Sequence, residues 1–129
     1  FRSKDFEVAD KHGEYSPYGS LGKALIHRLD GEWEEAEKIY TSILNEYPKM
    51  TDIYLKRAEC YLYLDQLSKL SLDLQAAAST EFANPTYYFL RGQMRLKQFD
   101  KVAARSDFKK AQELGMESEL LHPWIEKTN

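Results

Sequence analysis

The sequence predicts an all-α protein, a solenoid of antiparallel helix pairs that is closed at its C-terminal end by a capping helix. Three observations support this fold class. The chain has an internal 34-residue repeat, small and large side chains alternate at fixed places of the repeat, and proline follows a helix-capping residue where two repeats begin. The 129 residues suffice for one domain, and their composition, 43% hydrophobic and 30% charged, is typical of a folded globular chain.

The period divides the chain into three blocks, 17–50, 51–84 and 85–118, without insertion or deletion. The eighth place of each block is small and the twenty-fourth is large. These places hold Ala24, Ala58 and Gly92, and Tyr40, Leu74 and Phe108, respectively. A small side chain lets two helix backbones approach closely, and a large one fills the groove beside it. We therefore expect Ala58 to lie in a tight contact within its helix pair.

Each block reads as two helices joined by a short turn. Ser16-Pro17 and Asn84-Pro85 place a good N-cap before a proline that suits the first helical position, and Thr51 supplies the cap of the middle block. Gly31 permits a tight turn in the first block. The first helices are expected at 17–30, 52–64 and 86–98, and the second helices at 33–46, 67–80 and 100–114.

The period also extends toward the N-terminus. Phe6 lies one period before Tyr40, and Ala9 lies one period before Ile43. Residues 3–13 are therefore expected to form the second helix of an earlier, incomplete repeat, docked on the first full pair through Phe6 and Ala9. The resulting prediction is one domain, 1–129, made of a half-repeat followed by three whole repeats.

Residues 119–129 follow the last block and are rich in apolar side chains: Leu120, Leu121, Trp124 and Ile125. An open solenoid end exposes apolar surface, so these residues are expected to cover the last pair as a capping helix, in which Pro123 is a candidate break. An ordered but irregular tail is the alternative.

The blocks resemble the tetratricopeptide repeat in their period and in their small and aromatic places, over residues 17–118. The first block matches through Ala24, Gly31, Trp33, Ala36, Tyr40 and Pro48, and the third through Tyr88, Gly92, Ala104, Phe108 and Ala111. The second block is degenerate, with Leu70 where a small residue is usual. Phe99 stands in the place of the turn glycine, so we expect an irregular turn there. The resemblance implies a right-handed superhelix whose concave groove, lined by the first helices, holds a partner segment.

The resemblance places the fifth residue of each block, Leu21, Leu55 and Phe89, on the groove face. We expect these three side chains to form one continuous exposed apolar stripe, which would mark a binding surface. The full candidate groove comprises Tyr18, Leu21, Leu25, Leu55, Glu59, Leu62, Phe89, Gln93 and Leu96. The alternative is that some of these residues belong to the core or to a self-association surface.

One subclass of the resembled family clamps the C-terminal carboxylate of heat-shock chaperones with lysine, asparagine and arginine at set groove places. Here those places hold Leu21, Leu25, Lys56, Thr86 and Leu90. Only Lys56 has the cationic character that a carboxylate requires. The sequence therefore argues against a chaperone clamp.

The seventh place is basic in every block, as Lys23, Arg57 and Arg91. This column could form a cationic ladder for an acidic partner or a phosphate backbone. The favoured interpretation is that each stem packs between helices and each head pairs with a nearby carboxylate, because the resembled family turns this place toward the neighbouring helix.

The sequence shows no sign of catalysis. The three histidines, His12, His27 and His122, lie far apart without metal-ligand spacing, so neither metal nor other cofactor is expected. Cys60, the single cysteine, is expected to be an inert buried thiol. The acidic cluster of Glu32, Glu34, Glu35 and Glu37 opens a helix and is expected to be a solvated face.

The leading expectation is a protein-interaction scaffold that binds a protein or peptide in a largely apolar groove. The alternative is an assembly module that forms a homo-oligomer or stacks on further repeats of a larger parent chain. RNA or an acidic ligand, bound through the basic column with Arg95 and Lys97, is less favoured because the net charge is -3. No apolar run is long enough to span a membrane, and the sequence favours the cytoplasm only slightly over other compartments.

Overall fold

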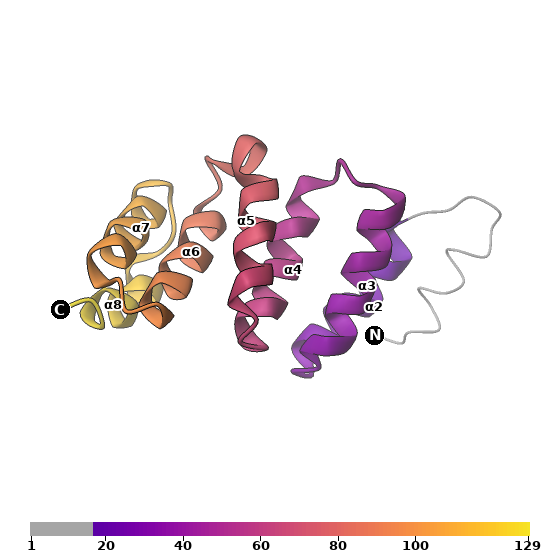
Figure 1. Cartoon of the computed structure of the whole chain (residues 1–129), viewed down its shortest axis with the longest axis horizontal. Coiled ribbons are helices and arrows are strands. Elements are labelled where there is room, and N and C mark those ends of the chain that lie inside the picture. Colours follow the sequence, from indigo (N-terminus) through magenta and orange to yellow (C-terminus); the bar gives the residue numbers. More distant parts are fainter. Residues whose placement is uncertain (1–16) are drawn as a thin grey trace.

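The computed structural model describes residues 17–129, so the expected half-repeat at 3–13 and the Ser16 cap lie outside the described residues. The described part is a row of helices that contains no strands, and the chain runs from right to left along this row in the view of Figure 1. The helices are α2 (Pro17–Leu29), α3 (Trp33–Glu46), α4 (Thr51–Tyr63), α5 (Leu67–Glu81), α6 (Pro85–Lys97), α7 (Lys101–Glu113) and α8 (Ser118–Glu126). Each of the six helices expected in the three blocks is present, and its ends differ from the expected ends by no more than one residue.

The helices pack as three consecutive pairs, α2 with α3, α4 with α5, and α6 with α7. Successive pairs touch through α3 and α4, then through α5 and α6, and α4 also contacts α6 directly. The helix α8 packs on α7 and covers the end of the row (Figure 1). This arrangement is the predicted α-solenoid of antiparallel helix pairs with a capping helix.

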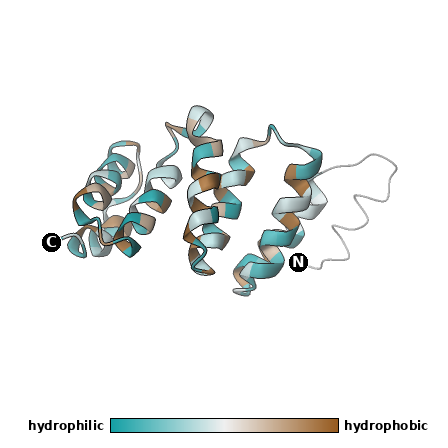
Figure 2. Ribbon diagram, viewed as in Figure 1, coloured by the Kyte–Doolittle hydropathy of each residue, from teal (hydrophilic) through white to brown (hydrophobic). Residues whose placement is uncertain are grey.

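Apolar residues recur at intervals along the helices and are not gathered in one long run (Figure 2). They form three clusters along the row. One cluster centres on Tyr40 and Ile43, the next on Leu70 and Leu74, and the last on Phe108 and Leu121. In the described range of 17–129, no helix is both long enough and apolar enough to cross a membrane.

The small column is buried in all three pairs, as its alternation with large residues predicts. Ala24, Ala58 and Gly92 are each buried between the two helices of their pair. At Gly92 an added Cβ would lie 2.5 Å from Cε1 of Phe108. No Cβ fits at that distance, so glycine is what lets α6 and α7 pack with the Phe108 ring between them.

The three turns inside the pairs share one backbone conformation, which corrects the irregular turn expected at Phe99. Gly31, Asp65 and Phe99 occupy the same place of their blocks, and all have left-handed φ angles, of 75°, 57° and 62°. In each turn, the backbone N–H of the residue that follows the left-handed one donates to the carbonyl oxygen five residues before it. The hydrogen bond from Asp100 N to Arg95 O, at 2.9 Å, is an example. The regular turn is therefore kept in the third pair, with conformational strain in Phe99.

The helix caps agree with expectation at one site and differ at another. The Asn84 Oδ1 atom accepts a hydrogen bond of 3.0 Å from Thr86 N at the start of α6. Thr51 is not the cap of α4, because the helix already begins at Thr51 and Met50 occupies the cap position. The Thr51 hydroxyl instead accepts a hydrogen bond from Thr80 Oγ1, at 2.6 Å, and so links α4 to the end of α5.

The C-terminal segment forms the expected capping helix. Leu121 of α8 is fully buried against α7, and Trp124 packs beside Phe108 with ring centroids 6.1 Å apart. The helix α8 continues through Pro123, so the candidate break there was wrong. Pro123 lies in the second turn of this nine-residue helix, where its missing N–H donor removes a single backbone hydrogen bond.

Candidate functional site

A hollow of about 520 Å³ opens on the side of the row formed by the first helices of the pairs. The helices α2 and α4 provide most of its walls, and the residues at the start of α6 close one end. The residues that line it are Leu21, Gly22, Leu25, Arg28, Tyr40, Asp52, Leu55, Lys56, Glu59, Asn84 and Thr86. The resemblance implies a partner groove along the first helices, and this hollow is lined mainly by two of them, α2 and α4.

The floor of the groove is apolar. Leu55 is 4% exposed and belongs to the central core cluster, but part of its side chain still faces the groove. Leu21 is half-buried against the first core cluster, and Leu25 is 40% exposed. Tyr40 adds its ring from α3, and burial raises the pKa of its hydroxyl to about 12, so the group is neutral at physiological pH.

An ion pair joins the two walls of the groove. The Nε and Nη2 atoms of Arg28 on α2 donate to the two carboxylate oxygens of Glu59 on α4, the second over 3.1 Å. This hydrogen bonding raises the pKa of Arg28 above its ordinary value. Since the pair neutralises itself, the charged groups left for a ligand are Lys56 and Asp52, both exposed on α4.

Four of the nine candidate groove residues line this hollow: Leu21, Leu25, Leu55 and Glu59. The other five do not. Tyr18 is exposed outside the hollow, Leu62 and Gln93 are buried, and Phe89 and Leu96 pack on the third core cluster. The expected continuous exposed stripe is therefore wrong, because Leu55 is buried and Phe89 is partly covered by Trp124, 5.9 Å away between ring centroids.

The candidate set omitted Arg28 and Asp52, which also line the groove. Helical periodicity could have identified both. Arg28 follows Leu21 by seven residues, and Asp52 precedes Glu59 by seven, so each shares a helix face with a residue that was chosen. Tyr40 and Asn84 reach the groove from a second helix and from a loop, and the spacing of the first helices does not indicate them.

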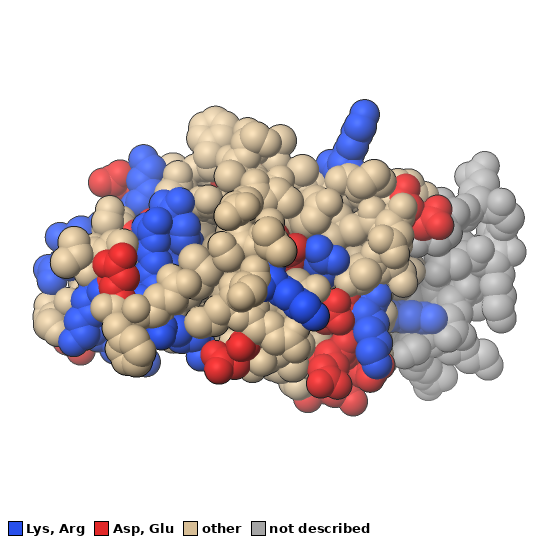
Figure 3. Space-filling model, viewed as in Figure 1, with Lys and Arg blue, Asp and Glu red and all other residues tan. Residues whose placement is uncertain are grey.

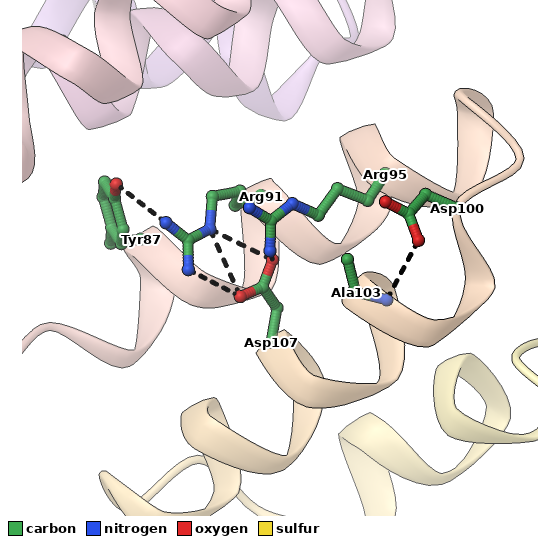
Figure 4. A network of polar contacts seen from close by, with 6 residues as sticks. All are labelled: Tyr87, Arg91, Arg95, Asp100, Ala103 and Asp107. Atoms are coloured by element: carbon green, nitrogen blue, oxygen red, sulfur yellow. Dashed lines mark hydrogen bonds and ion pairs between the residues drawn. The ribbon is translucent and has the colours of Figure 1, made fainter.

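The basic column has a structural role in the second and third pairs, as the favoured interpretation predicts. Arg57 donates two hydrogen bonds to the buried carboxylate of Asp73, at 2.9 and 2.6 Å. Arg91 bonds in the same way to Asp107, which also accepts a hydrogen bond of 2.9 Å from Arg95 (Figure 4). These guanidinium groups are occupied inside the helix pairs and do not form a ladder for a ligand.

A second column of the sequence could have revealed these pairs. Asp73 and Asp107 are one period apart, and each follows the basic residue of its block by 16. The first block has Ile39 at this place, so this pairing is particular to the second and third blocks. Burial raises the pKa of Asp73, and the hydrogen bonds from Arg57 oppose that shift.

The described residues contain neither a candidate metal site nor an accessible thiol. Between residues 17 and 129 no group of three or more His, Cys, Asp or Glu side chains could hold a metal ion. Cys60 is fully buried, and burial raises the pKa of its thiol to about 12. In the acidic cluster Glu32, Glu34 and Glu35 are exposed as expected, whereas Glu37 accepts a hydrogen bond of 3.0 Å from the Tyr61 hydroxyl and links two pairs.

Comparison with solved structures identifies the fold, although no protein-family model matches the sequence and no curated protein matches it. A tetratricopeptide repeat protein from Parabacteroides merdae superposes with a TM-score of 0.82 at 27% identity, over 98% of this chain and 49% of that one. The chain thus spans about half the length of that protein. The TPR domain of Arabidopsis OM64 gives a TM-score of 0.79 at 19% identity, over 88% of this chain and 93% of the other.

A further match is the first TPR domain of Spaghetti, solved with an HSP90 peptide of sequence SRMEEVD. It has a TM-score of 0.77 and 20% identity, and the alignment covers 87% of this chain and 89% of that domain. Together with the in-phase repeats and the helix pairs, these likenesses show that the chain has the tetratricopeptide-repeat fold.

Proposed function

We propose that this protein is a non-catalytic scaffold that binds an apolar segment of a partner protein in the groove between α2, α4 and α6. The observation that carries the proposal is the groove itself, in which the leucines Leu21, Leu25 and Leu55 lie side by side across two pairs. Leu25, which is 40% exposed, adds accessible apolar surface to this groove. The related Spaghetti domain was solved with a bound peptide, which supports a protein partner.

The chemistry of the groove favours an apolar ligand over an acidic one. The places that the chaperone clamp fills with lysine, asparagine and arginine here hold Leu21, Leu25, Lys56 and Thr86, which line the groove, and Leu90, which is buried. Lys56 is the one cation at those places. Arg28, the other cation of the groove, is paired with Glu59, and Asp52 lies one turn from Lys56 on the same helix. An acidic peptide such as SRMEEVD would therefore bring several carboxylates to a site that carries little net positive charge.

A substitution that introduces a positive charge into the groove tests this proposal. The probes are the labelled peptide SRMEEVD and a labelled, C-terminally amidated peptide SRMLLVL, both measured by fluorescence anisotropy. The parent should bind SRMLLVL more tightly. Leu25→Lys should weaken that binding about tenfold, since it replaces apolar contact worth about 1.4 kcal/mol, and it should strengthen binding of SRMEEVD.

Leu29→Lys is the matched control, because Leu29 lies on the same helix, is exposed, and does not line the groove. It makes the same substitution with the same change in net charge. Equal effects of the two variants, or tighter binding of SRMEEVD than of SRMLLVL by the parent, would refute the apolar groove.

The second candidate function is assembly on further repeats. The chain aligns with only 49% of the Parabacteroides protein, which continues beyond the matched region. Light scattering over a range of concentrations tests whether this chain assembles with itself, because a self-associating module should grow in mass as concentration rises and a peptide scaffold should remain monomeric.

A further inference from the structure

A second surface, which is basic where the groove is largely apolar, lies on the exposed face of α7. Lys101, Arg105 and Lys109 follow one another at four-residue intervals, so they form a stripe along one side of the helix. The stripe borders a shallow hollow of about 620 Å³, which Val102 also lines. Lys101 Nζ and Arg105 Nη1 contact the backbone and side-chain oxygens of Asn129, at 3.2 and 2.9 Å. We refer to Lys101, Arg105 and Lys109 as the basic stripe.

Two exposed carboxylates lie near the basic stripe: Asp100, which caps the start of α7 through Ala103 N, and Glu113. The single carboxylate side chain that lines the same hollow is Glu113, and its oxygen is 3.7 Å from Nζ of Lys110. Asp107 is on the same helix, but it is buried and bonded to two arginines of α6. In the visible face of the molecule, lysines and arginines gather over α6 to α8, whereas the acidic residues gather toward α2 and α3 (Figure 3).

Two highly exposed apolar residues lie at the start of this helix. Phe99 is 91% exposed and Val102 is 85% exposed. Phe99 also adopts a left-handed backbone conformation, at a turn position that is glycine in the first pair. A large side chain at this position is conformationally strained, and its packing within the described chain offsets almost none of that strain. Contact with another molecule gives a reason to keep it there.

The spacing of the basic stripe fits an extended acidic peptide. Cations four residues apart on a helix are separated by about 6 Å along its axis. Alternate residues of an extended chain, whose side chains point the same way, are separated by about 6.6 Å. Three carboxylates at alternate residues can therefore each meet one cation of the stripe, while an apolar residue beside them contacts Phe99 and Val102.

We propose that the exposed face of α7 docks an acidic, extended segment of another protein, with an apolar residue of that segment placed against Phe99 and Val102. This surface is separate from the groove of the proposed function. A short peptide is favoured over a nucleic acid because the whole chain carries a net charge of -3. A long polyanion would extend past the basic stripe and be repelled by the acidic residues of α2 and α3. A short segment would interact only with charges within about 8 Å of it, because salt screens more distant ones.

The test uses a fluorescein-labelled peptide made of one phenylalanine followed by repeated Glu-Ala dipeptides, titrated with the full chain. The double variant Arg105→Glu/Lys109→Glu should weaken binding more than about tenfold. The matched double variant Lys38→Glu/Lys49→Glu makes the same charge change at exposed lysines elsewhere and should weaken binding no more than about twofold. Phe99→Gly should weaken binding with little change in its salt dependence.

Thermal melts of all variants check that each is folded before binding is compared. Equal losses in the two double variants would show that only the total charge matters, and would overturn the proposal. So would tighter binding of a single-stranded oligouridine that Arg105→Glu/Lys109→Glu abolishes, which would indicate a nucleic-acid surface. Concentration-dependent growth in mass that the same variant abolishes would overturn it too, in favour of a second copy of this chain. Arg105→Glu/Lys109→Glu should leave binding of the groove probe SRMLLVL unchanged, because neither residue lines the groove, so failure of the groove proposal is distinguishable from failure of this one.

Discussion

Replacing Phe99 with glycine should make this protein more stable. At a φ of 62° a residue with a Cβ atom is strained by about 1–2 kcal/mol, and glycine removes that strain. Glycine also has more freedom in the unfolded chain, which costs about 0.5–1 kcal/mol. Because the Phe99 side chain is 91% exposed, its removal loses little packing. The net expectation is a gain of about 0.5–1 kcal/mol, or about 2–4 °C in Tm.

Urea unfolding and thermal melts of three variants provide the measurement. Gly31→Phe makes the reverse change at the equivalent turn and should destabilise by a similar amount. Asp65→Gly should change stability little, because aspartate tolerates the left-handed conformation and Asp65 also forms an ion pair with Lys97 at 3.3 Å. A loss of stability in Phe99→Gly would show that the ring packs against the chain, and the strain argument would fail.

Three further outcomes follow from the packing. Gly92→Ala should cost about 1–3 kcal/mol in urea unfolding, because Phe108 is held between Phe89 and Trp124 and cannot yield to the new methyl group; an unchanged midpoint would contradict this. Cys60, whose thiol pKa is raised to about 12, should not react with Ellman's reagent at about pH 8 until urea unfolds the chain, and rapid native labelling would disprove its burial. Asp73→Ile alone should lower the free energy of unfolding by about 3 kcal/mol, because the Arg57 guanidinium loses its carboxylate partner. Arg57→Lys/Asp73→Ile, which copies the residues of the first block, should recover most of that stability. Equal losses in the two variants would mean that the ion pair does not matter.

The fold could be predicted from the sequence because its signals are local and repeated. The 34-residue period, the column of small residues and the Asn84-Pro85 helix start each reflect contacts within one helix pair. Because the pairs repeat, the pattern is supported independently by each block. The turn at Phe99 was misjudged because its residue is unusual there. The hydrogen bonds at the end of α6 hold the same turn as in the other pairs, so the backbone keeps its geometry and the residue accepts the strain.

The binding surface was harder to predict because equivalent places in a repeat share a backbone position but not a neighbour. Leu21, Leu55 and Phe89 occupy the same place of three blocks, yet Leu21 is half-buried in the groove, Leu55 is buried, and Phe89 packs on Trp124. Each difference depends on the element that stacks next. Leu55 is enclosed because α6 follows α4, and Phe89 is covered because α8, and not another first helix, follows α7. The period therefore predicts the backbone position of a side chain, whereas the element packed next to it determines whether that side chain is exposed to a partner.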